Sequence, residues 1–230
     1  MLEQTAMGKA VICKVSCIAL QECQEAMGGI GYMDEPDEPD SNISRLYRDT
    51  AANMTWEGTT NVLSSEIVRH LLNGRNLNIF STWLEGRTID RIWNPDLRDT
   101  LATSWWTLKQ SLQAGKNDLA TALADGRQIM FSLAWIVSGA LLCHDAQRDD
   151  NATALEVAHR WVLDKDGGVG EFVLHDVVFA ANPRKVDTHE RLNWDCRLVW
   201  GFDLPSDASS GYRVVTVPSS GTPEKMMAKL

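Results

Sequence analysis

The chain has 230 residues, of which 44% are apolar and 23% are charged, and its formal net charge is −9. This length and composition are typical of a globular chain that buries a sizeable core, which argues against a disordered or fibrous chain. Because acidic residues outnumber basic ones and no basic stretch stands out, nucleic acid is not an expected partner.

The cysteines do not predict a metal site. There are five of them, an odd number, and Cys13, Cys17 and Cys23 fall on one predicted helix at spacings unlike those of a zinc site. No histidine lies near these three, so we expect reduced, buried thiols in an intracellular protein. The segment Met1–Thr5 lacks the basic and apolar regions of a secretion signal, so a secreted protein is not expected.

The first predicted element is a long amphipathic helix that ends at a glycine pair. Apolar residues recur at helical spacing from about residue 5, and Gly28-Gly29 is a common stop signal. Residues 34–41 then hold five acids and two prolines, which predicts an exposed loop. A surface for a basic partner is the less favoured interpretation of this loop.

Two helices are predicted on either side of residues 53–60. The first covers residues 43–52, where Arg45 and Arg48 are expected to pair with Asp49 or with a neighbouring chain. The second covers residues 61–72 and ends at Asn73-Gly74. Its apolar stripe consists of Leu63, Ile67 and Leu71, joined by Val62, Val68 and Leu72.

Further helices are predicted over residues 96–114, 117–147 and 153–164, so that residues 60–164 form a helical bundle. The centre of the second, residues 129–143, is almost wholly apolar. A stretch of this length is shorter than the ~20 residues that span a bilayer. It predicts a buried central helix and no membrane span.

The sequence pattern changes after residue 165. Residues 173–181 and 212–217 favour β-structure, while residues 182–211 show no clear period. The sequence therefore predicts a helical domain over residues 1–165 and, over residues 166–230, a C-terminal extension and flexible tail of uncertain structure.

Tryptophan is abundant, with nine residues. Stacking on nucleic-acid bases would need basic neighbours, which the acidic balance does not supply, so most are expected in the core or in interfaces. Trp56 is the exception, because it precedes Glu57 in a segment that looks like a site.

The segment from Gly28 to Asn61 contains two groups of glycines, and Glu57 lies just before a predicted helix. Glycine lets a ligand approach the backbone closely, and Thr59 and Thr60 are candidate N-caps, so free amides are expected beside Glu57. Two plainer interpretations exist. In the first, the role of Gly28, Gly29 and Gly31 is solely to end a helix and form a turn. In the second, the role of the Glu57 carboxylate is solely to interact favourably with the helix dipole.

Three segments in order, Glu25–Tyr32, Arg45–Asp49 and Trp56–Thr59, resemble the carboxy-terminal helical domain of acyl-CoA dehydrogenases. Within that family they are most similar to the alkylation-response branch, which also has Trp before the Glu-Gly pair. The resemblance is clear over residues 5–75 and looser to residue 165. It implies a mainly α fold, a helical bundle of the acyl-CoA dehydrogenase C-terminal type.

The resemblance also implies an activity, the α,β-dehydrogenation of acyl-CoA thioesters with FAD as hydride acceptor. Glu57 matches the family's α-proton base, which must be desolvated when the substrate closes over it. Trp56 and Gly58 would then contribute to the acyl-CoA site, with Trp56 in its apolar wall.

The resemblance places FAD contacts on two stretches. The family's Gln-x-x-Gly-Gly motif falls on Glu25, Gly28 and Gly29, where Glu replaces the usual Gln. The Thr-x-Gln contact falls on Thr59 and Asn61, where the amide is one methylene shorter. A carboxylate at position 25 is a poorer neighbour for the phosphates of a dinucleotide.

The family's amino-terminal helical domain and β-domain have no counterpart in this sequence, so we expect the isolated chain to be colourless, without retained FAD. The alternative function is a non-catalytic alkylation-response-type or oligomerisation module without turnover. Because family members assemble largely through this domain, a homo-oligomer is expected.

The last three residues, Ala228, Lys229 and Leu230, resemble the address that peroxisomal import receptors read, of which Ser-Lys-Leu is the common form. They predict a peroxisomal protein that binds an import receptor. The alternative is a cytoplasmic protein whose tail ends this way by chance.

Overall fold

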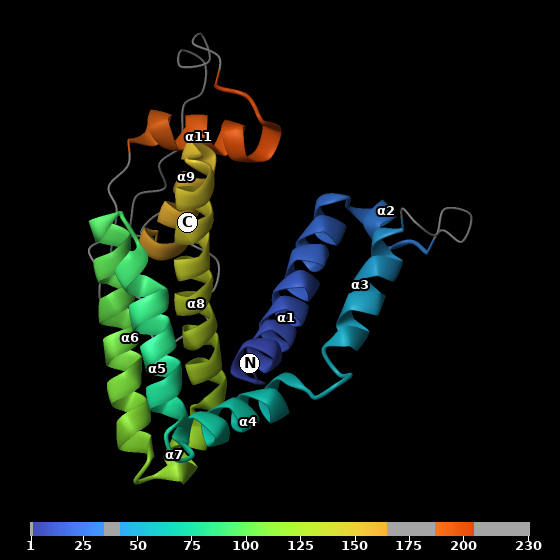
Figure 1. Ribbon diagram of the computed structural model, residues 1–230. Coiled ribbons are helices and arrows are strands. Elements are labelled where there is room, and N and C mark those ends of the chain that lie inside the picture. Colours follow the sequence, from blue (N-terminus) through green and yellow to red (C-terminus); the bar gives the residue numbers. More distant parts are fainter. Residues whose placement is uncertain (1, 35–41, 165–186, 205–230) are drawn as a thin grey trace, which may run out of the picture. The chain divides into compact units, whose positions relative to one another are not determined.

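The computed structural model describes residues 2–34, 42–164 and 187–204 (Figure 1). The chain divides into two compact units, residues 1–184 and 185–230. In the described part the elements are helices and no strand occurs, which confirms the mainly α prediction. The segments expected to favour β-structure, residues 173–181 and 212–217, and the terminal Ala228–Leu230 lie outside the described residues. The predicted domain boundary at residue 165 lies at the start of the stretch, residues 165–186, that is outside the described residues.

The first unit contains two groups of helices. One group, which we call the arm, consists of α1 (Leu2–Ala26), α2 (Gly29–Tyr32) and α3 (Ile43–Asn53). The other group, the bundle, consists of α4 (Thr60–Leu72), α5 (Asn76–Arg87), the 3-10 helix η1 (Ile89–Arg91), α6 (Pro95–Gly115), α7 (Leu119–Ala124), α8 (Gly126–Asp149) and α9 (Ala152–Leu163).

Helix α8 is the centre of the bundle and packs against α4, α6 and α9. Helix α8 extends beyond the almost wholly apolar stretch, residues 129–143, at both ends. By length and composition alone its 24 residues could cross a membrane, but 72% of its apolar window is buried inside the protein. The predicted buried central helix is confirmed, because α8 buries residues on all of its faces at mid-length, from Ile129 to Val137.

The apolar stripes that predicted the bundle lie in its core. Leu63, Ile67 and Leu71 of α4 are buried, although Val62 at the edge of the stripe is half exposed. In α6 the buried residues follow the predicted steps of three and four. They are Leu97, Leu101, Trp105, Leu108 and Leu112.

A polar cluster joins α5 to α6. Glu85 Oε1 accepts hydrogen bonds from Ser81 Oγ at 2.7 Å, Trp105 Nε1 at 2.8 Å and Lys109 Nζ at 2.9 Å. Partial burial acts to raise the pKa of Glu85, but the hydrogen bonds from Lys109, Ser81 and Trp105 outweigh it and hold the pKa below its ordinary value. The carboxylate therefore stays charged and satisfied at the helix interface.

Several helix predictions need correction. The single helix expected over residues 117–147 is two helices, α7 and α8, separated at Asp125. Helix α5 and η1 were not predicted, because polar Asn, Ser and Thr residues interrupt the apolar spacing. In the second unit, residues expected to lack a period form α11 (Thr188–Trp200), which the Asp187 side chain caps and Gly201 ends in the left-handed conformation.

The arm is a helical hairpin. Helix α1 leads away from the bundle to α2, and α3 returns beside α1 (Figure 1). The start of α1 packs on the bundle, where Ala6, Met7 and Ala10 are buried, and α1 contacts α4 and α8. The predicted pairing with Asp49 is confirmed for Arg45, with 3.6 Å between Nε and Oδ2, whereas Arg48 Nη2 pairs with Asp34 Oδ2 at 3.1 Å.

Candidate functional site

Glu57 lies in the turn between α3 and α4, in a conformation that side-chain-bearing residues rarely adopt. Its φ is 54° and that of Gly58 is 103°. A positive φ costs a residue with a Cβ of the order of 1–2 kcal/mol, whereas glycine adopts it freely. The Glu57 side chain is exposed, and no described residue lies within hydrogen-bonding distance of its carboxylate. The Glu57 backbone conformation costs stability, and its exposed carboxylate is available to a ligand. Glu57 is therefore a candidate functional residue.

A contact from another helix supports this turn. The Lys9 Nζ on α1 donates a hydrogen bond to the Gly58 carbonyl oxygen at 2.6 Å. A Cβ added to Gly58 would lie 3.1 Å from the Leu63 side chain of α4. The arm therefore contacts the turn, and position 58 has little space for a larger residue.

The start of α4 has free amides, as predicted. Thr59 is the N-cap residue, but its side chain forms no capping hydrogen bond, so the expected capping role is not realised. Asn61 is exposed in the first turn. The side chain of Trp56 is also 67% exposed, so it does not form a wall within this chain alone.

The other predicted cofactor residues lie at the far end of α1. Glu25 is sixteen residues from Lys9, which corresponds to about 24 Å along a helix that rises 1.5 Å per residue. Gly28, with φ 64°, precedes α2, and neither it nor Gly29 has an atom within 4 Å of an added Cβ. Gly31 differs, since an added Cβ would lie 2.2 Å from the Gln24 carbonyl oxygen.

The residues of one chain therefore do not fit FAD as a single site. Glu25, Gly28 and Gly29 lie at one end of α1, while Thr59 and Asn61 lie with Glu57 near its other end. The structure brings together only the second group. Local motifs could not indicate this separation, because it depends on the length of α1.

The cysteines are not all buried, contrary to the prediction. Cys17 and Cys143 are buried, Cys13 and Cys196 are partly buried and Cys23 is exposed. Burial raises the pKa of the Cys143 thiol to about 12. Within the described ranges, no group of three or more His, Cys, Asp or Glu side chains could hold a metal ion.

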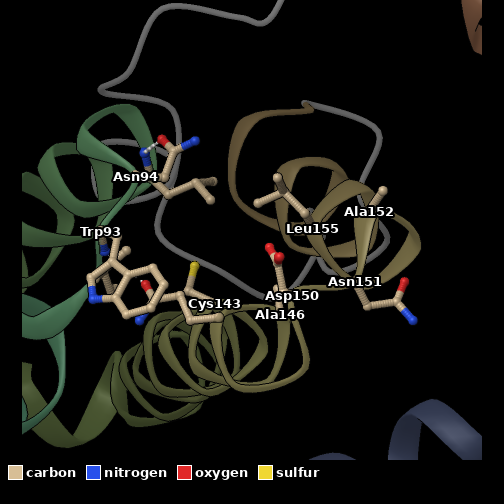
Figure 2. Close-up of a pocket in the computed structure, with 11 residues that line it drawn as sticks. Trp93, Asn94, Cys143, Ala146, Asp150, Asn151, Ala152 and Leu155 are labelled. Carbon is tan, nitrogen blue, oxygen red and sulfur yellow. Dashed lines mark hydrogen bonds between the residues drawn. The ribbon is translucent and has the colours of Figure 1, made fainter.

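A pocket that the sequence did not indicate lies at the other end of the bundle (Figure 2). It is formed where the loop before α6, the end of α8 and the start of α9 meet, and its volume is about 280 Å³. Trp93 and Asp150 lie at its rim. The only hints in the sequence are the polar turns Trp93-Asn94-Pro95 and Asp149-Asp150-Asn151.

Two known families match different parts of the chain. Residues 1–72 match the family described as acyl-CoA oxidase, C-alpha1 domain, and residues 97–166 match acyl-CoA dehydrogenase 11 C-terminal domain-like. The first match includes the Glu57 turn and the second includes most of the bundle. No solved structure matches the chain significantly.

Two curated proteins are similar to the chain. The acyl-CoA dehydrogenase-like protein AidB of Escherichia coli (strain K12) is 39% identical over 67 residues, which is 29% of this chain and 12% of AidB. Acyl-CoA dehydrogenase family member 11 of Caenorhabditis elegans is 30% identical over 161 residues, which is 61% of this chain and 24% of that protein. The chain thus spans about a quarter or less of the length of these relatives. Together with the helical fold, the matches show that the chain is similar to carboxy-terminal helical domains of the acyl-CoA dehydrogenase and oxidase families.

Proposed function

We propose that this chain is the carboxy-terminal part of an FAD-dependent acyl-CoA dehydrogenase, in which Glu57 removes the α proton of an acyl-CoA thioester. The observation that carries the proposal is the positive φ of Glu57, combined with its free carboxylate. A glycine would occupy this position without strain, so the carboxylate is retained at a cost in stability.

The neighbouring groups support a role in acid–base chemistry. Lys9 donates a hydrogen bond to the Gly58 carbonyl oxygen, so a contact from α1 helps to position the turn that carries the carboxylate. Trp56 and Gly58 lie beside it, where an acyl chain or thioester would have to bind. FAD, when bound in the complete enzyme, would supply the hydride acceptor; the residues of this chain contribute the proton acceptor.

The test measures exchange of the α proton of an acyl-CoA in D₂O, with the chain assembled with the family's amino-terminal domains. Glu57→Gln keeps the shape of the side chain but cannot accept the proton, so exchange should fall by at least about 100-fold. Glu66→Gln, an exposed glutamate on α4, is the matched control and should exchange at the wild-type rate. Normal exchange in the Glu57→Gln protein would place the base elsewhere.

A second variant tests the strain argument. Glu57→Gly should abolish exchange and also raise the free energy of unfolding by about 1 kcal/mol, because glycine accepts the left-handed conformation. The unfolding free energy is measured by urea titration of the chain. A less stable Glu57→Gly protein would remove the observation on which the proposal rests.

The separation of the cofactor residues favours a second candidate function. A non-catalytic alkylation-response-type module, or an oligomerisation module, would not need Glu25 and Thr59 to meet in one site. This candidate predicts that assembled protein turns over no acyl-CoA although it folds. Turnover by the assembled wild-type protein would decide against it.

Self-association belongs to the same proposal. Ile12, Val15 and Ile18 form an exposed apolar row on α1, and Ile12 is 66% exposed. We expect a homo-oligomer at micromolar concentration in sedimentation, which Ile12→Glu dissociates. Ile79→Glu, at a bundle position that is 67% exposed, is the matched control and should leave the oligomer intact.

We also propose a peroxisomal location through Ala228, Lys229 and Leu230. A fluorescent reporter that carries the last twelve residues should be punctate, and removal of Leu230 should make it diffuse. A diffuse signal with Leu230 present would favour the cytoplasmic alternative.

A further inference from the structure

The pocket at the end of the bundle is far along the fold from the Glu57 turn and does not depend on it. Its interior is mostly apolar, since Ile92, Leu97, Cys143 and Ala146 are all buried. Cys143 is a neutral thiol at physiological pH, because burial raises its pKa to about 12. The lining is therefore uncharged except at the rim, and it would accept an apolar group.

Most of the polar lining side chains already have partners. The Asn94 oxygen caps α6, accepting two backbone N–H groups at 3.0 and 3.2 Å, and its Nδ2 lies 3.2 Å from His159 Nε2. The Asn151 oxygen caps α9 in the same way, at 2.8 and 3.2 Å. The Gln147 Oε1 accepts a hydrogen bond from the Trp93 backbone N–H at 2.7 Å, and its Nε2 donates one to the Arg91 carbonyl oxygen at 3.2 Å. These acceptors are used to build the pocket walls.

Asp150 is the exception among the polar lining side chains. No described residue hydrogen-bonds or forms an ion pair with its carboxylate, whereas the neighbouring Asp149 is paired with Arg148 at 2.7 Å. Figure 2 shows the Asp150 carboxylate directed toward the space between the residues on the α6 side and Leu155 on the α9 side. It is the free acceptor that this pocket offers to a ligand.

The backbone at Asp150 is also unusual. Its φ is 47°, and together with Glu57 it is one of the two non-glycine residues with positive φ in the described part of the chain. It is the C-cap of α8, where glycine or asparagine is preferred and where the helix dipole disfavours a negative charge, although the start of α9 offsets part of this effect. Aspartate tolerates this conformation, so the unfavourable feature at this position is the charge beside the C-terminal end of α8.

Trp93 supplies an aromatic face at the same rim. Its side chain is 75% exposed although it lines the pocket. Indole faces attract cations more strongly than the faces of other aromatic side chains, and the attraction adds to that of a nearby carboxylate. An anion, such as the phosphates of an acyl-CoA, would be repelled by Asp150 and would find no free cationic partner among the lining residues.

We infer that this pocket binds a small organic cation, an ammonium group on an apolar body. The body occupies the space above Leu97 and Cys143, and the ammonium lies between the Asp150 carboxylate and the Trp93 indole. No covalent step is involved. The site is separate from the Glu57 turn, so its function would be recognition of a ligand and not acyl-CoA chemistry.

The experiment titrates the full chain with three probes of similar shape and different charge: phenethylammonium, 2-phenylethanol and 3-phenylpropionate. Binding is followed by the indole N–H resonance of Trp93, which Trp93→Phe identifies in a ¹H–¹⁵N spectrum. Phenethylammonium should shift this resonance saturably, and it should bind about tenfold or more tightly than the alcohol, because a charge-assisted contact of 1.4 kcal/mol is worth that factor. The carboxylate probe should not bind.

Three variants separate the effect of the Asp150 carboxylate from that of net charge and of backbone conformation. Asp150→Asn keeps a residue that tolerates the left-handed conformation but removes the charge, so affinity for phenethylammonium should fall about tenfold to that of the alcohol. Asp149→Asn makes the same change in net charge one residue away and should bind normally. Asp150→Gly, which relieves the backbone, should lose affinity equally while it stays folded. Equal affinity for the three probes, unchanged binding by Asp150→Asn, or no saturable shift would each overturn the inference.

Discussion

The bundle and the arm are both helical, but they bury their apolar residues very differently. In the bundle, long stripes on α4, α6 and α8 are fully buried against one another. In the arm, α1 buries Ala6, Met7 and Ala10 near its start, while Ile12, Val15 and Ile18 further along remain exposed. The bundle supplies its own core, whereas the arm presents surface that the described residues do not cover. The predicted cofactor residues Glu25, Gly28 and Gly29 are on the arm, at the end of α1 that lies away from the bundle and from Glu57.

The largest difference in stability between the bundle and the arm is expected from a pair of side-chain truncations, one in each region. Leu108 of α6 is completely buried, so Leu108→Ala should lower the free energy of unfolding by about 2–5 kcal/mol through lost burial and the cavity it leaves. Ile12→Ala on the arm removes a mostly exposed side chain and should change it by no more than about 0.5 kcal/mol in the monomer. Urea titration at low protein concentration measures both. Equal losses would mean that the arm shares the bundle's core.

A smaller effect is expected from the glycines of the arm. Gly31→Ala places a Cβ 2.2 Å from the Gln24 carbonyl oxygen, a backbone atom that cannot move alone. It should destabilise the turn between α1 and α2 by about 1–3 kcal/mol. Hydrogen exchange of amides in α2 and α3 measures this change locally, because only the arm should open more often.

The matched control is Gly29→Ala, two residues away. An added Cβ there meets nothing within 4 Å, and the residue's φ is not positive. Exchange in the arm should therefore be nearly unchanged. An equal increase in exchange for Gly29→Ala and Gly31→Ala would mean that the space around Gly29 is occupied. This end of the arm would then not be exposed.

The bundle could be predicted from the sequence because its signal is periodic. Leu97, Leu101, Trp105 and Leu108 recur at helical steps, and a stripe that wide must be buried. The break between α7 and α8 was missed, since Asp125 interrupts an apolar pattern that continues on both sides. Helix α11 was missed because polar residues dominate its first two turns, so its caps at Asp187 and Gly201 were the better signals.

The candidate site could be predicted only where it is local. Glu57, Gly58 and Thr59 are consecutive, and the structure keeps them together in one turn. Their separation from Glu25 was not predictable from either motif, because it is set by the 25 residues of α1. The pocket beside Asp150 was also missed. It exists only because the ends of α8 and α9 meet the loop before α6, residues that are distant in the sequence.

The bundle and the arm should also differ in the reactivity of their cysteines, which can be measured without changing the fold. Cys143 of α8 is 1% exposed, and burial raises its pKa to about 12, against a small opposing effect of a backbone hydrogen bond. Cys23 of α1 is exposed. Because only the thiolate reacts and burial keeps the Cys143 thiol protonated, Cys143 should react with iodoacetamide at pH 8 far more slowly than the exposed Cys23. Mass spectrometry of digests taken over time measures both rates, and labelling in denaturant should make them equal.

The same pKa gives a prediction for stability at high pH. The folded-state pKa of Cys143 is raised from its ordinary value of 9.0 to about 12, so the stability that comes from keeping this thiol neutral is fully present below pH 9.0. Above it, the unfolded chain loses the proton while the folded chain keeps it, so stability should decline as the pH rises toward 12. Cys143→Ala removes the titrating group and should flatten this decline, whereas Cys23→Ala on the exposed part of the arm should leave it unchanged. An identical decline in all three proteins, or rapid labelling of folded Cys143, would contradict the interior position of α8 on which the contrast between bundle and arm depends.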